Sequence, residues 1–128
     1  ARPSRKLRVL IVEDEHYVMR ALTRGLSDMA EVVGCTTRRE AEAILDADRA
    51  FDVVLCDLGL EDGSGLDLFD GLGGPTEHLR ARFILMSGDD LSGARVDVTL
   101  LSKPFDLQRA RAAIEQVMAS VGDPFETR

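Results

Sequence analysis

The chain has 128 residues, of which 45% are hydrophobic and 30% are charged. This composition is typical of one compact domain with a hydrophobic core, and it favours neither disorder nor a second domain. No apolar run approaches the roughly 20 residues that cross a bilayer, which argues against a membrane-spanning helix. The formal net charge of −7 argues against general nucleic-acid binding, because contact with phosphates requires a basic surface. We therefore expect a soluble cytoplasmic protein with neither nucleic-acid nor membrane partners.

The first half of the chain alternates between strand and helix patterns. Residues 6–12 are apolar and rich in β-branched side chains, which predicts a strand, and residues 15–29 carry apolar side chains at helical spacing. Residues 30–35 predict a second strand, and residues 38–47 predict a second helix. The chain therefore opens with two strand-helix units.

The second half continues this alternation. Residues 51–56 are hydrophobic without a break, as expected of a strand that is covered on both faces, and residues 64–72 predict a short helix. Residues 82–86 and 98–101 predict the fourth and fifth strands. Apolar side chains at helical spacing over residues 107–121 predict a closing helix.

Local signals mark the ends of several elements. Thr37 and Glu40 form a capping box before the second helix, and Ser64 and Asp67 form another before the third. Only residues 88–97 connect the fourth strand to the fifth, with a glycine among them. We therefore expect a shortened fourth helix of about one or two turns at that position.

Strands that alternate with helices in this way predict a three-layer α/β fold, in which right-handed crossovers place helices on both faces of a parallel sheet. Cys35 and Cys56 lie inside strand patterns, so we expect buried, reduced thiols rather than a disulfide or a metal pair. We assign residues 1–6 to an N-terminal linker or tail, residues 7–121 to the folded domain and residues 122–128 to a C-terminal tail.

Polar side chains stand at the carboxyl ends of four predicted strands. They are Glu13 and Asp14 after the first strand, Asp57 after the third, Ser87 after the fourth and Lys103 after the fifth. In an open parallel sheet, ligands bind outside this edge, where the strand order reverses. We therefore expect the five side chains to form one site.

The residue types at these strand ends favour phosphoryl transfer. Two carboxylates 4 Å apart repel by about 4 kcal/mol at an effective dielectric constant of about 20, so a cluster of them favours a bound cation. Hard oxygen ligands without His or Cys suit Mg²⁺ rather than zinc. With Asp57 as nucleophile, the cation, the Lys103 ammonium and the Ser87 hydroxyl would neutralise the developing charge.

Each of these residues also has a structural explanation when taken singly. Glu13 and Asp14 could serve only as acids at a helix N-terminus, Ser87 could cap a helical turn, and Lys103 could be solvated. Their joint placement at four strand ends is what favours a shared site.

Four segments carry a resemblance to a known family. They are the acid pair in VLIVEDE, Asp57 in VVLCDLGLEDGSG, the serine and glycine in LMSGD, and the lysine, proline and phenylalanine in LLSKPF. With these motifs the chain, from about residue 6 to residue 121, resembles a receiver domain of the bacterial two-component response regulators. The resemblance implies a flavodoxin-like (βα)5 fold with strand order 2-1-3-4-5 and a role in a phosphorelay.

The same resemblance implies how the acidic residues act. Asp57 would accept a phosphoryl group from a phosphohistidine and signal by conformational change. Mg²⁺ or Mn²⁺ would be bound by Asp14, by Asp57 and by the backbone carbonyl of Gly59, and Glu13 would hold the metal through a water molecule.

Side chains at two further strand ends would contact the phosphoryl group. Ser87 would hydrogen-bond one phosphoryl oxygen and Lys103 would contact another, while Gly88 leaves space beside them. The family usually has a cis peptide bond between this lysine and the following Pro104, which would turn the lysine toward the site.

The implied phosphodonor is a histidine kinase or a histidine phosphotransfer protein that docks on the first helix, residues 15–29. The domain would catalyse only its own phosphorylation and dephosphorylation, so any kinase activity would lie in another domain. No output domain fits after residue 121, so we expect a single-domain regulator or a receiver cut from a larger protein such as a hybrid histidine kinase.

Three positions depart from the family pattern. Leu100 stands where the family usually has a Tyr or Phe that swings inward on phosphorylation. The abbreviated segment over residues 89–97 argues against homodimerisation through the face of the fourth helix. Glu61 replaces the usual proline after the phosphoacceptor and Gly59 has no side chain, so we expect a more flexible loop with an open approach to Asp57.

Two other functions are compatible with parts of this pattern. A pseudo-receiver would have the same fold but act as a phosphorylation-independent protein-interaction module, as the leucine at residue 100 and the short fourth helix allow. An aspartyl phosphohydrolase would place a D-x-D pair after the first strand, whereas the acids are adjacent here. The receiver is the reading that accounts for all four motifs.

Overall fold

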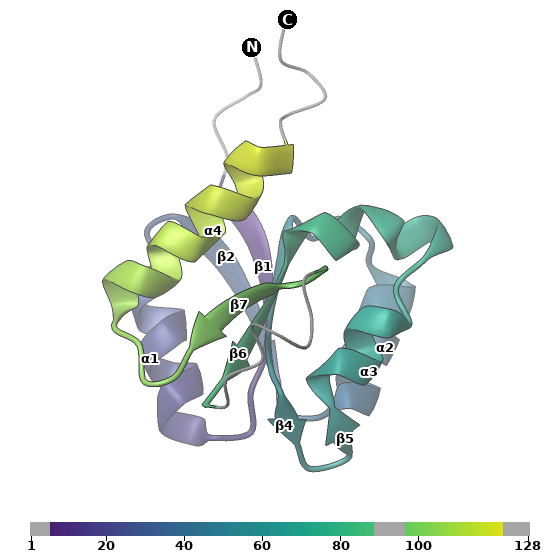
Figure 1. Cartoon of the computed structure of the whole chain (residues 1–128), viewed down its shortest axis with the longest axis horizontal. Coiled ribbons are helices and arrows are strands. Elements are labelled where there is room, and N and C mark those ends of the chain that lie inside the picture. Colours follow the sequence, from purple (N-terminus) through teal and green to yellow (C-terminus); the bar gives the residue numbers. More distant parts are fainter. Residues whose placement is uncertain (1–5, 89–96, 122–128) are drawn as a thin grey trace, which may run out of the picture.

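A five-stranded parallel sheet forms the centre of the protein (Figure 1). The computed structural model describes residues 6–88 and 97–121 of the chain. The strands are β1 (Leu7–Val12), β2 (Ala30–Cys35), β3 (Val53–Asp57), β6 (Phe83–Ser87) and β7 (Thr99–Ser102). Their order in the sheet is β2-β1-β3-β6-β7, which is the expected order 2-1-3-4-5 when these five strands are counted along the chain.

Helices cover both faces of this sheet. They are α1 (His16–Leu26), α2 (Arg38–Ala47), α3 (Gly65–Asp70) and α4 (Leu107–Val121), with the 3₁₀ helix η1 (Gly74–Arg82) before β6. Figure 1 shows α1 and α4 on one face and α2 and α3 on the other, and each face has its own hydrophobic core. The predicted three-layer, flavodoxin-like fold is therefore confirmed.

The central strand β1 shows why the sheet is covered on both faces. Its side chains alternate between the two sides of the sheet, as in any strand. Leu10 and Val12 belong to the core under α2 and α3, whereas Val9 and Ile11 belong to the core under α1 and α4. All four are fully buried, which explains why the sequence of this strand is apolar at consecutive positions.

Both predicted capping pairs lie at helix N-termini. The Thr37 side chain accepts a hydrogen bond from the Glu40 N–H, and the Glu40 carboxylate reaches back to the N–H of Thr36, one residue earlier than expected. Ser64 and Asp67 form the reciprocal capping box of α3. Helices α2 and α3 therefore begin where the local sequence predicts.

Some limits of elements differ from the predictions. Helix α1 ends at Leu26 rather than at residue 29, because the Met29 N–H turns back to the Leu26 carbonyl and leads directly into β2. Strand β3 continues through Asp57, and η1 was not predicted. The predicted short fourth helix falls largely on residues 89–96, which lie outside the described residues, as do the terminal residues 1–5 and 122–128.

A small antiparallel hairpin follows β3. It consists of β4 (Gly59–Leu60) and β5 (Gly63–Ser64), with Gly59 opposite Ser64 and Leu60 opposite Gly63. The sequence suggested only a flexible loop here. The two paired strands instead give this loop regular hydrogen-bonded structure immediately after Asp57.

The two cysteines are buried and unbridged, as predicted. Burial raises the pKa of Cys35 to about 12 and also raises the pKa of Cys56, so both thiols stay protonated at neutral pH. Within residues 6–88 and 97–121, no helix combines the length and the hydrophobicity needed to span a membrane.

Candidate functional site

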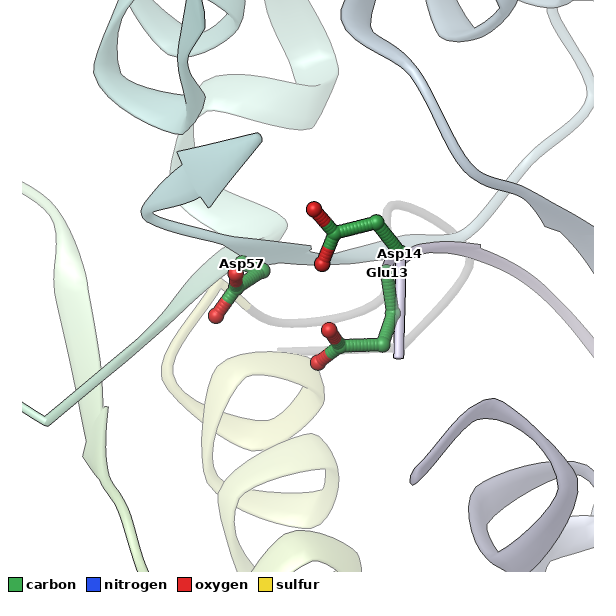
Figure 2. A group of neighbouring side chains, drawn as sticks. All are labelled: Glu13, Asp14 and Asp57. Carbon is green, nitrogen blue, oxygen red and sulfur yellow. The ribbon is translucent and has the colours of Figure 1, made fainter. Parts of the chain in front are cut away.

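Three carboxyl groups meet at the carboxyl ends of two neighbouring strands (Figure 2). Glu13 and Asp14 directly follow β1, and Asp57 is the last residue of β3. These strands pair in parallel with Val12 opposite Cys56, so the residues that follow this pair, Glu13 and Asp57, come side by side. One oxygen from each of the three carboxyl groups lies within 4.8 Å of the others. The structure thus brings the three predicted acidic residues together.

The three acidic residues differ in burial. Glu13 is fully buried, Asp57 is 9% exposed and Asp14 is exposed. One oxygen of Glu13 accepts a hydrogen bond of 3.1 Å from the Glu15 N–H. Burial raises the pKa of Glu13, and the hydrogen bonds from Glu15 and Lys103 offset this rise only in part. The site therefore holds two buried acids, Glu13 and Asp57, and one exposed acid, Asp14.

Lys103 connects two of these carboxylates. Its Nζ lies 2.7 Å from Asp57 Oδ1 and 3.1 Å from Glu13 Oε1. Burial lowers the pKa of Lys103, but the hydrogen bonds to Asp57 and Glu13 outweigh it and leave the pKa above its usual value. The bond between Lys103 and Pro104 is cis, as the resemblance implied. The lysine is therefore a charged partner of both acids.

Ser87 stands at the same edge of the sheet. It is the last residue of β6 and is 4% exposed. Its backbone carbonyl accepts a hydrogen bond of 2.7 Å from the Lys103 N–H, which fixes the lysine to the neighbouring strand end. A side-chain carbon added at the next residue, Gly88, would meet no atom of residues 6–88 and 97–121 within 4 Å, so these residues leave the space beside the serine open.

Two glycines shape the surroundings of Asp57 in opposite ways. A Cβ added at Gly59 would meet no atom of the described part of the chain within 4 Å. A Cβ at Gly65 would overlap the backbone carbonyl oxygen of Asp57 and lie 3.0 Å from Cys56 Sγ. Gly65 therefore allows α3 to begin directly against the end of β3. No local sequence pattern marks this contact, because the close neighbours of Gly65 are brought to it only by the fold.

The donor atoms of the acidic group fit a hard divalent cation. All three residues offer carboxylate oxygens, which Mg²⁺ prefers, and neither His nor Cys belongs to the group. Asp14 is exposed, so the acidic group is in contact with solvent on one side. This agrees with the sequence-based expectation of Mg²⁺ or Mn²⁺ rather than zinc.

A parallel sheet of this order, with an acidic cluster and a lysine at its carboxyl edge, defines the class of receiver proteins. The chain belongs to the response regulator receiver domain family, whose family model matches residues 9–115. Members of this family are signalling domains of two-component systems, in which they work with histidine kinases or phosphotransfer proteins. They bind Mg²⁺ in their acidic pocket.

Individual relatives agree with this assignment. The chain is 33% identical over 127 residues to the transcriptional regulatory protein KdpE of Mycobacterium tuberculosis, covering 88% of this chain and 53% of the relative. The chain thus spans about half the length of the curated relatives it matches.

Solved structures show the same fold. The receiver domain of HemR from Leptospira biflexa, in its non-phosphorylated form, has a TM-score of 0.76 and 29% identity, covering 96% of this chain and 98% of that one. The chemotaxis response regulator CheY4 of Vibrio cholerae has a TM-score of 0.80 and 19% identity, covering 89% and 100%.

Proposed function

We propose that this domain accepts a phosphoryl group on Asp57 from a phosphohistidine, in a reaction that depends on Mg²⁺ or Mn²⁺, and that it signals by conformational change. The observation that carries the proposal is the position of the Lys103 ammonium, 2.7 Å from Asp57, beside two further acids. A buried ion pair that served stability alone would not require an exposed third carboxylate at the same strand ends. The arrangement suits a group that must bind a cation and a phosphoryl group together.

Asp14, Asp57 and the backbone carbonyl of Gly59 are the proposed metal ligands, with Glu13 acting through a water molecule. The metal, when bound, would supply positive charge next to the phosphoryl oxygens. The role of buried Glu13 follows from its partners, since its two oxygens already accept hydrogen bonds from Glu15 and Lys103. Exposed Asp14 is the member of the pair that is better placed to contact a cation directly.

In the proposed transfer, a carboxylate oxygen of Asp57 attacks the phosphorus atom. The new O–P bond forms as the P–N bond to the donor imidazole breaks, and that nitrogen keeps the electron pair and takes up a proton. The Lys103 ammonium and the Ser87 hydroxyl then stabilise the phosphoryl oxygens by charge and by hydrogen bonding. Water attack on the same phosphorus atom would return Asp57 to its free form.

The phosphodonor would dock on α1. A groove of about 480 Å³ runs between this helix and the segment after β7, and Lys103 is part of its lining. Tyr17 and Leu107, which are 72% and 40% exposed, also line it. A partner seated in this groove would bring its phosphohistidine toward the lysine and so toward Asp57. This is the support for a histidine kinase or phosphotransfer protein as partner.

Beryllofluoride, which mimics a phosphoryl group, tests the proposal directly. Added with Mg²⁺ to the wild-type protein, it should shift the NMR amide signals of Asp57, Ser87 and Lys103. Asp57→Asn keeps the shape of the side chain but removes the reactive carboxylate, so this variant should give no such shifts. Phosphotransfer from a phosphorylated histidine phosphotransfer protein should likewise label the wild type and not the variant.

A wild-type protein that does not respond to beryllofluoride would overturn the receiver proposal and favour the pseudo-receiver. Leu100 is the residue that is compatible with a pseudo-receiver. It is half-buried against the core under α2 and α3, at the position where the family usually has an aromatic switch residue. A response at Asp57 without the aromatic residue would mean that switching uses other side chains.

A further inference from the structure

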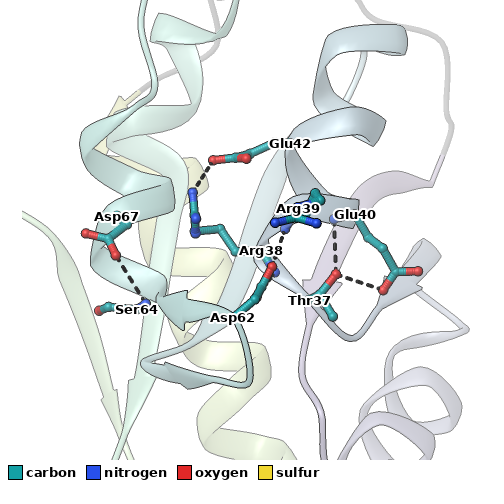
Figure 3. Close-up of polar contacts among 8 residues, drawn as sticks. All are labelled: Thr37, Arg38, Arg39, Glu40, Glu42, Asp62, Ser64 and Asp67. Atoms are coloured by element: carbon teal, nitrogen blue, oxygen red, sulfur yellow. Dashed lines mark hydrogen bonds and ion pairs between the residues drawn. The ribbon is translucent and has the colours of Figure 1, made fainter.

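The hairpin that follows Asp57 is tied to a helix that takes no other part in the site. Asp62 lies in the turn between β4 and β5, and its carboxylate faces the N-terminus of α2 (Figure 3). Oδ1 accepts a hydrogen bond of 2.7 Å from the Arg38 N–H, and Oδ2 accepts one of 2.9 Å from the Arg39 N–H. These two residues are the first two of α2. One side chain of the hairpin therefore binds both backbone donors at the start of the helix.

The backbone N–H groups at the start of α2 donate to acceptors from two different parts of the chain. The first N–H groups of a helix have no partner within the helix. The Thr37 side chain accepts the hydrogen bond of the Glu40 N–H from within the same segment. Asp62, more than 20 residues away in the sequence, accepts the hydrogen bonds of the Arg38 and Arg39 N–H groups. A negative charge at this end also interacts favourably with the helix dipole. The same hydrogen bonds hold the pKa of Asp62 below its usual value, so the carboxylate is ionised at neutral pH.

Side-chain packing strengthens this attachment. A Cβ at Gly63 would lie 2.9 Å from Arg38 Nε, so the arginine side chain lies directly over the glycine. Gly63 also has a φ of +145°, which residues other than glycine rarely adopt. A hydrogen bond of 2.8 Å to Glu42, one turn further along α2, orients the Arg38 guanidinium (Figure 3).

The base of the hairpin is fixed to a different helix. The Gly65 N–H, at the start of α3, donates a hydrogen bond of 2.7 Å to the Leu58 carbonyl, next to Asp57. The side chain of Leu60 is buried in the core under α2 and α3. With its base on α3 and its turn on α2, the hairpin is held at both ends, and Gly59 lies between them.

We propose that Asp62 is a positioning residue for the metal site: by binding the N-terminus of α2 it holds the β4–β5 hairpin, and with it the Gly59 carbonyl, in place to bind Mg²⁺. This inference rests on the proposed function, in which that carbonyl is a metal ligand. Coupling between two sites is reciprocal. Mg²⁺ at the site should therefore also stabilise the hydrogen bonds between Asp62 and the first residues of α2.

The test compares two variants that each remove a cap from α2. Asp62→Ala removes the cap and releases the hairpin, whereas Thr37→Ala removes a cap and leaves the hairpin attached. Partners that hydrogen-bond directly to metal ligands are worth about 10- to 100-fold in affinity, and Asp62 acts less directly, so we expect Asp62→Ala to weaken Mg²⁺ binding about three- to tenfold. Thr37→Ala should bind Mg²⁺ as the wild type does, and Asp62→Asn, which keeps one acceptor oxygen, should be intermediate.

Calorimetry gives the Mg²⁺ affinities, at a temperature where circular dichroism shows every variant to be folded. Amide hydrogen exchange supplies a second measurement that does not depend on affinity. In the wild type, Mg²⁺ should slow exchange at Arg38 and Arg39. In Asp62→Ala the exchange at these amides should be insensitive to Mg²⁺, because the carboxylate that connects them to the hairpin is gone.

The outcomes separate this inference from the proposed function. If the wild type binds no Mg²⁺, the proposed function fails. If the wild type binds Mg²⁺ but Asp62→Ala binds it equally well, or if Thr37→Ala is weakened to the same degree, the positioning role of Asp62 is wrong and the proposed function stands.

Discussion

At the scale of single residues, the site depends on the Lys103 ammonium, which lies between two carboxylates. Lys103 is a partner of both Glu13 and Asp57, and its side chain is 24% exposed. The pKa of Glu13 is raised by burial, so the contribution of this carboxyl group to stability is present at low pH and declines as the pH rises through its folded-state pKa. At neutral pH the ammonium therefore offsets a cost that the buried carboxylate would otherwise impose.

Replacement of Lys103 should lower the stability by the cost of burying the ionised Glu13 carboxylate without its partner. Lys103→Met keeps the apolar stem and removes the charge, and we expect the free energy of unfolding at about pH 7 to fall by about 1–3 kcal/mol, less than for a fully buried pair because the lysine is partly exposed. The difference from wild type should be smaller at an acidic pH below the raised pKa of Glu13, because this carboxyl group is then protonated. Urea unfolding at the two pH values measures both effects. A loss of equal size at both would mean that packing, rather than charge, is what Lys103 contributes.

At the scale of secondary-structure elements, a close contact between α3 and β3 sets the position of Asp57. Helix α3 begins at Gly65, directly against the backbone carbonyl of Asp57, and the Gly65 N–H binds the Leu58 carbonyl. The capping box of Ser64 fixes where the helix starts. A side chain at residue 65 would have to push the helix away from the strand that carries Asp57.

Glycine substitutions at the two ends of α3 test this contact. Gly65→Ala should lower the free energy of unfolding by about 1–3 kcal/mol, because the added methyl group overlaps the Asp57 carbonyl in a packed region. Gly71→Ala is the matched control: its Cβ would lie 3.4 Å from the nearest atom and its φ is −82°. There the stability should be unchanged or higher by up to about 1 kcal/mol. Equal stabilities of the two variants in urea unfolding would contradict the role given to Gly65.

At the scale of the whole molecule, the sheet order gathers residues from distant parts of the chain at one edge. β1 and β3 are neighbours in the sheet and β7 lies two strands from β3, so Glu13, Asp57 and Lys103 meet although 90 residues separate the first from the last. The same arrangement places α1 beside the segment that follows β7, which creates the groove next to the lysine. The site and the proposed docking surface therefore come from one topological feature.

Tyr17 in this groove should matter for a protein phosphodonor and not for a small one. We expect Tyr17→Ala to slow phosphotransfer from a phosphorylated histidine phosphotransfer protein by about fivefold or more, because exposed aromatic side chains often contribute over 1 kcal/mol to an interface. Phosphorylation by phosphoramidate should keep its wild-type rate. Arg24→Ala, on the same helix but outside the groove lining, is the control. If Tyr17→Ala slowed phosphorylation equally with both donors, Tyr17 would act within the domain and not in docking.

The sequence by itself determined the alternation of strands and helices, because burial on one or both faces leaves a local periodic pattern in the chain. It also determined the caps at Thr37 and Ser64, whose partners lie within four residues. The acids and the lysine could be named because parallel strands bring their carboxyl ends to one edge.

Only the tertiary structure decided how those residues are connected. The bridge from Lys103 to two carboxylates, the contact of Gly65 with Asp57 and the attachment of Asp62 to α2 join elements that are separate in the sequence. Such contacts leave no periodic signal, since they depend on the distance between elements after packing. The order of the sheet and the close approach of its helices therefore made one site from four strand ends.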